Sequence, residues 1–181
     1  MERQIALIAL FAALIAVLGL VPKFTLASGI PITAQGMGIM LCGTVLGARR
    51  GALAVLLFLG LVALGLPLLA GGRGGLGVFA GPTVGFLVGF PIAAFATGWI
   101  MERMRGAAVV PAALIAAILG GIVVLYIPGI AGMVAMLDLT PAQATLSMAP
   151  FIPGDLVKAG LTAALTAALY RARPESVLSR G

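Results

Sequence analysis

The sequence contains no histidine, a single cysteine (Cys42) and only five acidic residues among 181. Without histidine, a nucleophilic triad or a histidine proton relay is excluded. One cysteine provides neither a disulfide framework nor a thiolate metal site, and scattered carboxylates are poor ligands for a catalytic metal. We therefore expect no catalytic residue, metal or cofactor. The one enzymatic alternative is a membrane-embedded enzyme that uses Asp155 and Lys158 as a catalytic pair.

Charge is scarce as well, because charged residues make up 9% of the chain, against about 25% in a soluble domain. Hydrophobic residues make up 62%, and the mean hydropathy is +1.23. Such a chain cannot cover itself with polar surface, and no polar block is large enough to fold separately. We predict an all-α integral membrane protein in which residues 1–181 form a single domain surrounded by lipid.

Apolar segments of nearly spanning length recur from end to end, separated by glycine, proline or charge. The first resembles a signal peptide, but no small-residue cleavage site followed by a soluble region appears, so we interpret it as a helix. Gly29 and Pro31 predict an ordered loop over residues 28–33 instead of a helix. The six predicted transmembrane helices cover approximately residues 4–22, 34–48, 51–70, 78–101, 108–127 and 151–170.

The basic residues predict the orientation in the membrane. If the N-terminus is cytoplasmic, eight basic residues lie inside and three lie near the outer side, which is the expected bias of short loops. The inner group is Arg3, Arg49, Arg50, Arg103, Arg105, Arg171, Arg173 and Arg180, and the outer group is Lys23, Arg73 and Lys158. Both termini are then cytoplasmic. Basic residues at helix ends indicate topology, so we expect no nucleic-acid partner.

The connection between the fifth and sixth helices is predicted to be long, over about residues 128–150. Thr140 followed by Pro141 is typical of a helix N-cap and first position. We predict a short interfacial helix over residues 141–148. The sequence leaves open whether this helix seals the bundle or acts as a lid.

Residues 71–77 form the most unusual segment, with five glycines around Arg73 and Leu76. The segment satisfies the G-x-G-x-x-G pattern formally, but it joins two membrane helices, so a nucleotide site is excluded. Glycines allow positive φ angles and bring backbone N–H groups close to a ligand. The alternative is a tight outer turn. The candidate ligand-binding residues here are Gly72, Arg73, Gly74 and Gly75.

Asp155 and Lys158 lie at the outer start of the sixth helix, on one face because they are three residues apart. Ionisable groups in an apolar span are expensive and therefore indicate function. They could instead pair with each other, or cap the helix and reach the interface. Functionally, Lys158 would attract a carboxylate and Asp155 would accept hydrogen bonds from a ligand N–H.

Thr33 and Gln35 lie at the outer end of the second helix. The Gln35 amide offers a donor and an acceptor, so it could bind an amide or ureido group, or it could simply bond neighbouring backbone.

Small residues recur at four-residue spacing, which favours close packing of membrane helices. Two glycine series, Gly43, Gly47 and Gly51 and then Gly81, Gly85 and Gly89, are predicted to pack inside the bundle. In the first helix, Ala6, Ala9, Ala13 and Ala16 form a smooth strip. From the residues alone, this strip either packs in the bundle or docks a membrane partner.

Three stretches together resemble one known family: ITAQ (32–35), GLPLLAGGRGGLGVFAGPTVGFLVGFP (65–91) and PGDLVK (153–158). The chain resembles, over nearly its whole length, the BioY family, the biotin-specific substrate-binding (S) components of energy-coupling-factor (ECF) transporters. The resemblance implies a six-helix S-component bundle in the bacterial cytoplasmic membrane. It also implies an outward-facing biotin pocket, a transmembrane coupling protein and two cytoplasmic ATPase subunits. The chain has no P-loop motif for ATP hydrolysis.

The resemblance makes biotin the expected ligand. Its carboxylate suits Lys158 and the glycine-loop N–H groups, and its ureido head suits Asp155 and Gln35. Phe79 or Phe86 would give the sulfur ring an apolar wall. The sequence leaves open which end of biotin faces which residue. Other members often carry tyrosine where this chain has Phe86, so a hydroxyl is missing there.

An S component for another vitamin is the main alternative. Thiamine or riboflavin would favour aromatic or acidic surroundings, which one tryptophan and two tyrosines supply poorly. The resemblance also favours the alanine strip as the docking surface for the coupling protein.

Overall fold

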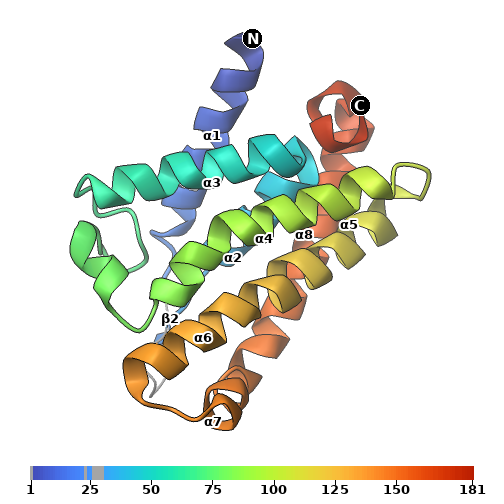
Figure 1. The fold of residues 1–181 in the computed structure, drawn as a ribbon. Helices are drawn as coiled ribbons and strands as arrows, with labels where there is room; N and C mark the ends of the chain where they lie inside the picture. The colour runs from blue at the N-terminus through green and yellow to red at the C-terminus, as the bar shows by residue number, and fades with distance from the viewer. Residues whose placement is uncertain (1, 23, 26–30) are drawn as a thin grey trace.

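The computed structural model describes residues 2–22, 24–25 and 31–181, and it is almost entirely helical (Figure 1). The helices are α1 (Glu2–Leu18), α2 (Gln35–Leu41), α3 (Ala48–Ala63), α4 (Val84–Arg103), α5 (Val109–Ile118), α6 (Leu125–Leu137), α7 (Pro141–Leu146) and α8 (Ile152–Ala172). Two π-helical segments continue neighbouring helices, η1 (Cys42–Leu46) after α2 and η3 (Leu119–Val124) between α5 and α6. Short 3-10 turns are η2 (Leu76–Ala80), η4 (Ala149–Phe151), η5 (Pro174–Ser176) and η6 (Leu178–Arg180).

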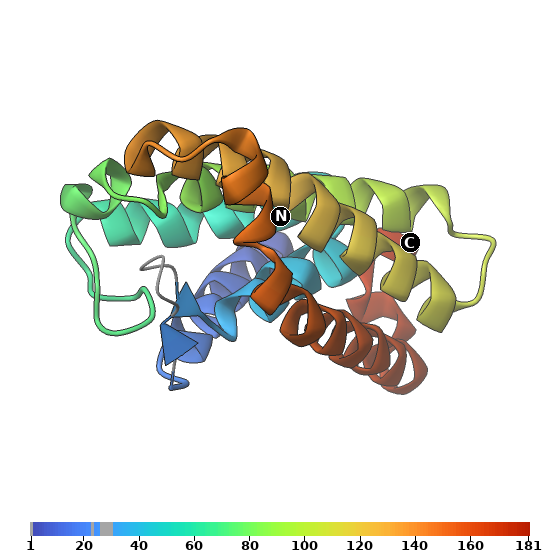
Figure 2. The same ribbon diagram turned by 90° about the horizontal axis from the view of Figure 1, so that it is seen from below.

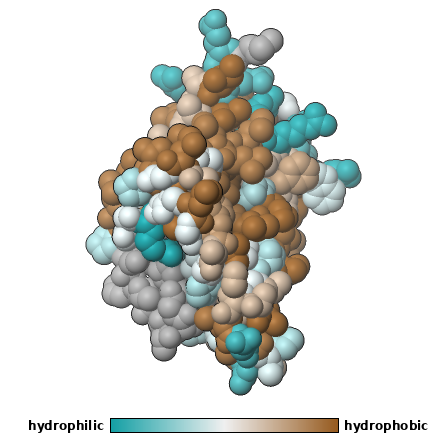
Figure 3. Space-filling model, turned by 60° about the vertical axis from the view of Figure 1, so that its left-hand side comes forward, coloured by the Kyte–Doolittle hydropathy of each residue, from teal (hydrophilic) through white to brown (hydrophobic). Residues whose placement is uncertain are grey.

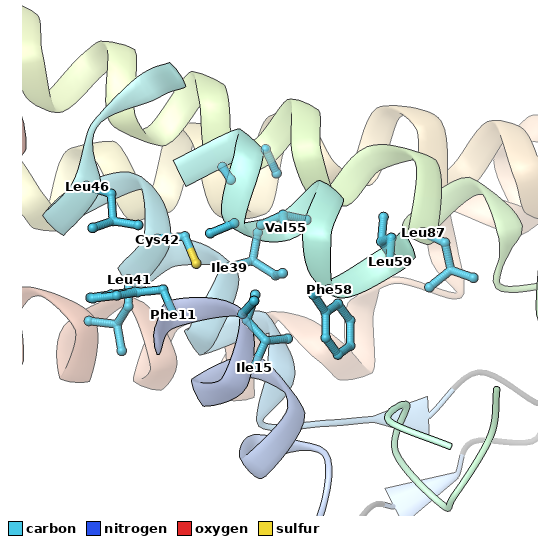
Figure 4. Packing of buried hydrophobic residues seen from close by; sticks show 14 of the residues in the cluster. Phe11, Ile15, Ile39, Leu41, Cys42, Leu46, Val55, Phe58, Leu59 and Leu87 are labelled. Atoms are coloured by element: carbon cyan, nitrogen blue, oxygen red, sulfur yellow. The ribbon is translucent and has the colours of Figure 1, made fainter. Parts of the chain in front are cut away.

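The helices form two layers, which both views show (Figures 1 and 2). One layer contains α3, α4 and the continuous run from α5 to α6, and the other contains α1, α2 and α8. Contacts of α1 with α3, of α2 with α4 and of α5 with α8 join the layers. The main core lies where α1, α2 and α3 meet, around Ile15, Ile39 and Phe58 (Figure 4).

Three helical runs are long and apolar enough to cross a membrane: Val84–Arg103, Val109–Leu137 and Pro141–Ala172. The run Gln35–Leu46 is apolar but shorter. Large apolar side chains, such as Val88 and Ile127, lie exposed on the outside of the bundle. The space-filling view shows a broad apolar band, with hydrophilic side chains concentrated at the upper end near the N-terminus (Figure 3). The prediction of a helical protein with apolar helices of membrane-spanning length is therefore confirmed.

Several predicted boundaries were wrong because loops rich in glycine and proline shorten the helices. The first helix ends at Leu18 and the third at Ala63, where positive φ at Gly65 precedes Pro67. The fourth helix begins only at Val84, after a separate 3-10 turn. Of the predicted loop over 28–33, residues 28–30 lie outside the described residues. Its described residues include β2 (Pro31–Ile32), which pairs antiparallel with β1 (Phe24–Thr25).

The largest correction concerns residues 128–137, which belong to α6 and not to a loop. Pro128 lies inside this helix and packs on glycines of α4, with its carbonyl at Gly85 and its ring at Gly89. The helix ends at Asp138, which has left-handed φ of 51°. A short helix is present where the sequence predicts one, although α7 ends at Leu146 and not at residue 148. Its predicted N-cap is confirmed: Thr140 Oγ1 accepts from Gln143 N at 3.3 Å, and Gln143 Oε1 accepts from Thr140 N at 2.9 Å.

The glycine series pack as predicted, with one exception. Gly43 lies against Thr97 and Ala94 of α4, and Gly51 lies against the Cys42 carbonyl. Gly85 meets the backbone of α6. Gly81, in contrast, has open space around it, so its assignment as a packing residue was wrong.

Eight of the nine arginines lie toward one end of the bundle, with the start of α1 and the C-terminal tail, and the exception is Arg73 in the glycine-rich loop. Arg3 donates to the Glu175 carbonyl at 3.0 Å, and Arg105 donates to the Ser179 carbonyl at 3.2 Å. Arg180 donates to the carbonyls of Met104 and Ala107 at the turn between α4 and α5. The glycine-rich loop and α7 lie at the opposite end (Figure 1).

The contact of Gly85 with α6 gives a direct test of the packing. Gly85→Ala places a Cβ against the Pro128 carbonyl, and overpacking of this kind costs about 1–3 kcal/mol. We expect a lower unfolding temperature in detergent, followed by circular dichroism. Gly60→Ala is the control, because Gly60 lies in helix α3 with open space around it, and alanine is favoured there by up to about 1 kcal/mol. Equal unfolding temperatures for the two variants would contradict the packing.

Candidate functional site

A cavity lies at the end of the bundle that carries the glycine-rich loop, between α2, α4, α6 and the start of α8. Its volume is about 80 Å³, which is smaller than that of a typical small-molecule site. The lining residues are Thr33, Gln35, Gly36, Leu69, Arg73, Thr83, Phe86, Leu87, Phe90, Leu125, Tyr126, Phe151, Asp155 and Lys158. Six of these were predicted from the sequence: Thr33, Gln35, Arg73, Phe86, Asp155 and Lys158.

Asp155 and Lys158 form the polar centre of this cavity. Lys158 Nζ donates to Asp155 Oδ1 at 2.8 Å, and their side chains are 13% and 15% exposed, respectively. The pairing that the sequence offered as an alternative is therefore present, but it does not remove the residues from the cavity wall. A charge-assisted bond in such low-dielectric surroundings holds both groups in one orientation.

Tyr126 completes this centre and was missed by the sequence analysis. Its hydroxyl donates to Asp155 Oδ2 at 2.8 Å, so both carboxylate oxygens are engaged. The signal was a tyrosine near the outer end of the fifth apolar segment, in a chain with only two tyrosines. Phe86 and Tyr126 line the same cavity, so Tyr126 supplies a hydroxyl although Phe86 carries none.

Aromatic side chains form the apolar wall. Phe86 and Phe90 come from α4, and Phe151 comes from the turn between α7 and α8. The Phe86 ring is seated on Gly129, where a Cβ would lie 2.5 Å from it. Phe79, the other predicted wall residue, does not line the cavity and packs against the main core instead.

Phe90 and Phe151 were missed because nothing in their spacing marks them. The segment before α8 also buries Ala144 and Met148 against Met133 of α6. This packing holds Phe151, which is 6% exposed, at the cavity.

Gln35 lies on the cavity wall but uses its amide to hold the surrounding backbone. Its Nε2 donates to the carbonyls of Ile15 at 3.1 Å and Leu68 at 3.0 Å, and its Oε1 accepts from Ala70 N at 3.0 Å. The side chain is 3% exposed. Both amide hydrogens are thus engaged, which agrees with the backbone-bonding alternative.

The glycine-rich loop takes the backbone conformation that its composition predicts. The φ angles of Gly71, Gly72 and Gly75 are 82°, 69° and 79°, which favour glycine. Gly72 and Gly74 line a second recess beside the cavity, and Arg73 and Thr83 line both spaces. Gly75 lines neither space and starts the turn into η2.

The alanine strip of α1 faces outward. Ala6, Ala9 and Ala13 are exposed and Ala16 is half-buried, whereas Ala12 beside them is 3% exposed and belongs to the core. The strip therefore covers little of this chain's own bundle.

No cluster of three or more histidine, cysteine, aspartate or glutamate side chains occurs within the described part of the chain.

Comparisons with known proteins agree with this architecture. The sequence model of the BioY family matches residues 2–175. The chain belongs to the BioY family. It is 54% identical to the biotin transporter BioY of Rhodobacter capsulatus, with full coverage of both chains. It is 48% identical to the biotin transporter BioY of Rhizobium etli, over 95% of each chain.

A solved structure also matches the fold. The crystal structure of the S component for biotin from an ECF-type ABC transporter superposes with a TM-score of 0.89 at 29% sequence identity. The match covers 94% of this BioY chain and 92% of that chain.

The bonds made by Gln35 predict that it secures the glycine-rich loop. Gln35→Ala removes three hydrogen bonds, a loss of about 2–4 kcal/mol in all. We expect trypsin to cleave this BioY variant after Arg73 faster than it cleaves the wild type, as followed by mass spectrometry in detergent. Gln4→Ala, at an exposed position of α1, is the control. An unchanged cleavage rate in Gln35→Ala would contradict this anchoring role.

Proposed function

We propose that this BioY protein binds biotin in the cavity and mediates its uptake as the S component of an ECF-type ABC transporter. The observation that carries the proposal is the Tyr126–Asp155–Lys158 cluster beside an aromatic wall, in a fold that matches a biotin S component. The relatives are named as biotin transporters, so the activity is transport and not catalysis. A different vitamin is the less favoured alternative.

Biotin matches the residues that line the cavity in charge and polarity. The ureido head carries N–H donors and a carbonyl acceptor, which suit Asp155 and the two donors that flank it, Tyr126 and Lys158. The sulfur ring then packs against Phe86 and its neighbours on the aromatic wall.

We propose that the carboxylate of biotin lies beside Arg73. Lys158 already shares its charge with Asp155, whereas Arg73 has no carboxylate within 4 Å among the described residues. Its Nε donates only a long bond, 3.4 Å, to the Ala70 carbonyl. The N–H groups of Gly72 and Gly74, in the adjoining recess, would support the anion, whereas the Gly75 N–H already donates to the Val62 carbonyl at 2.8 Å. Thr33 lines the same cavity and offers a hydroxyl.

The proposed setting is the bacterial cytoplasmic membrane, crossed by six helices with both termini cytoplasmic. The arginine-rich end then faces the cytoplasm and the cavity faces outward, in agreement with the distribution of basic residues. Residues 1–181 act as a single substrate-binding domain. A transmembrane coupling protein and two cytoplasmic ATPases supply the energy, because this chain has no P-loop.

Substitutions at the polar centre test biotin binding. Asp155→Asn and Lys158→Ala each remove a charged partner, and we expect each to weaken binding by about 1.5–3 kcal/mol in calorimetry. Tyr126→Phe removes one hydrogen bond, with a smaller loss of about 0.5–1.5 kcal/mol. Arg171→Gln, at an exposed position at the opposite end, is the control. Wild-type affinity in folded Asp155→Asn and Lys158→Ala would reduce the cluster to a structural ion pair.

Biotin amide, which lacks the negative charge of biotin, tests where the carboxylate of biotin binds. It should bind the wild type more weakly than biotin does, and Arg73→Gln should remove most of that difference. If Lys158→Ala removes the difference instead, the carboxylate lies at Lys158.

The exposed strip of Ala6, Ala9, Ala13 and Ala16 is proposed as the docking surface for the coupling protein, because small residues let membrane helices approach closely. Ala9→Trp with Ala13→Trp should abolish co-purification with the coupling protein and energised uptake. Biotin binding by the isolated protein should persist. Ala12→Trp is the contrasting variant, because Ala12 is 3% exposed and should disturb the bundle itself. Normal assembly of the Ala9→Trp/Ala13→Trp protein would refute the proposal.

A further inference from the structure

A second groove lies at the arginine-rich end, far from the biotin cavity, between the start of α3, the last turns of α4 and the C-terminal tail. Its lining includes three basic side chains, Arg49, Arg50 and Arg105, and three large apolar ones, Leu53, Phe95 and Trp99. The groove is therefore amphipathic, and no part of the proposed transport function uses it.

The basic side chains of this groove are largely available. Arg49 and Arg50 have neither a hydrogen-bond nor an ion-pair partner among residues 2–22, 24–25 and 31–181. Arg105 uses only its Nε, toward the Ser179 carbonyl. Both unpaired arginines lie in the first turn of α3, where the helix dipole disfavours positive charge. Their placement therefore does not serve the stability of that helix.

Acidic groups cancel only part of this charge. Glu102 and Glu175 also line the groove, but Glu102 Oε1 already accepts from Ala48 N at 2.9 Å. Within the groove, three arginines outnumber two glutamates, and this whole end of the molecule carries eight arginines against three glutamates. The charge of the groove is thus complementary to an anion.

The apolar side chains lie on the outside of the bundle. Leu53 is 51% exposed, and Phe95 and Trp99 are each 46% exposed. Trp99 is stacked with Arg103, whose guanidinium carbon lies 4.8 Å from the ring centre. A tryptophan beside arginines at the end of a membrane helix is typical of the headgroup level of a bilayer.

We propose that this groove binds an anionic phospholipid. The phosphate lies among Arg49, Arg50 and Arg105, which can hold phosphate oxygens through paired N–H donors. An acyl chain runs from there along Leu53 and Phe95. A basic pocket between membrane helices is a recognised kind of site for acidic lipid headgroups. A free phosphate would use the arginines but leave the apolar side chains without a partner.

Trp99 provides the test, because it is the only tryptophan of the chain. The full-length protein is placed in nanodiscs that contain brominated phosphatidylglycerol or brominated phosphatidylcholine at equal mole fraction. Bromine quenches tryptophan fluorescence at short range. We expect stronger quenching by the anionic lipid, and an apparent preference that falls about tenfold in Arg49→Gln/Arg50→Gln, since each arginine contributes attraction to an acidic lipid.

Two further variants distinguish a specific lipid site in the groove from a general effect of positive charge. Arg49→Lys/Arg50→Lys keeps the charge but loses paired hydrogen bonding, so the preference should fall only in part. Arg171→Gln/Arg173→Gln removes the same charge from the same end outside the groove and should change little. An equal effect of both Arg→Gln pairs, or equal quenching by the two lipids, would overturn the proposal.

Other occupants give different outcomes. If millimolar inorganic phosphate removes the preference, the site is a simple anion site and not a lipid site. If Trp99 in the assembled transporter is shielded from both brominated lipids, a protein partner covers the groove. Either result would overturn the lipid assignment, and neither depends on biotin binding.

Discussion

Close backbone contact between α4 and its two neighbours is the constraint on which the rest of this structure depends. In lipid, apolar side chains gain nothing by leaving their surroundings, so helices associate through close fit. Gly98 meets the backbone at Ala48 on one side of α4, and Gly120 meets Thr97 on the other. Gly85 continues this approach toward α6. These contacts bring Phe86 of α4 and Tyr126 of α6 to one cavity.

The polar centre of the cavity is already neutral before a ligand arrives. Asp155 and Lys158 compensate each other, and Tyr126 fixes the second carboxylate oxygen. A neutral ureido group can therefore bind there without bringing or removing charge. Among the described residues, Arg73 provides one unpaired positive charge at the glycine-rich loop, which matches a ligand with a single carboxylate. In the proposed binding mode, the cavity would separate the two ends of biotin by charge as well as by position.

Much of this architecture could be predicted from the sequence because the strongest signals are local. Apolar runs marked most of the helices, and costly polar residues within them marked Asp155, Lys158 and Gln35. The extent of α6 was mispredicted, because a proline such as Pro128 usually indicates the end of a helix. Its packing against glycines of α4 is visible only in the structure. Phe151 was missed and Phe79 was wrongly included, because convergence of aromatic rings on one space depends on how separate helices pack.

The number of membrane-spanning helices, their orientation in the membrane and the roles of the individual site residues remain predictions. They depend on a membrane and on ligands, which the packing of the chain alone does not define.

The π-helical segment η3 controls the direction of everything that follows it in the same run of helix. A π turn holds an extra residue, and each residue of an α-helix advances the side-chain direction by about 100°. Tyr126 comes two residues after η3, which ends at Val124. The angular phase of Tyr126, and with it the second bond to Asp155, is therefore set by the winding of six residues that never touch the ligand cavity. A relative with one residue fewer in this segment would turn that hydroxyl away from the cavity while keeping every residue of the site.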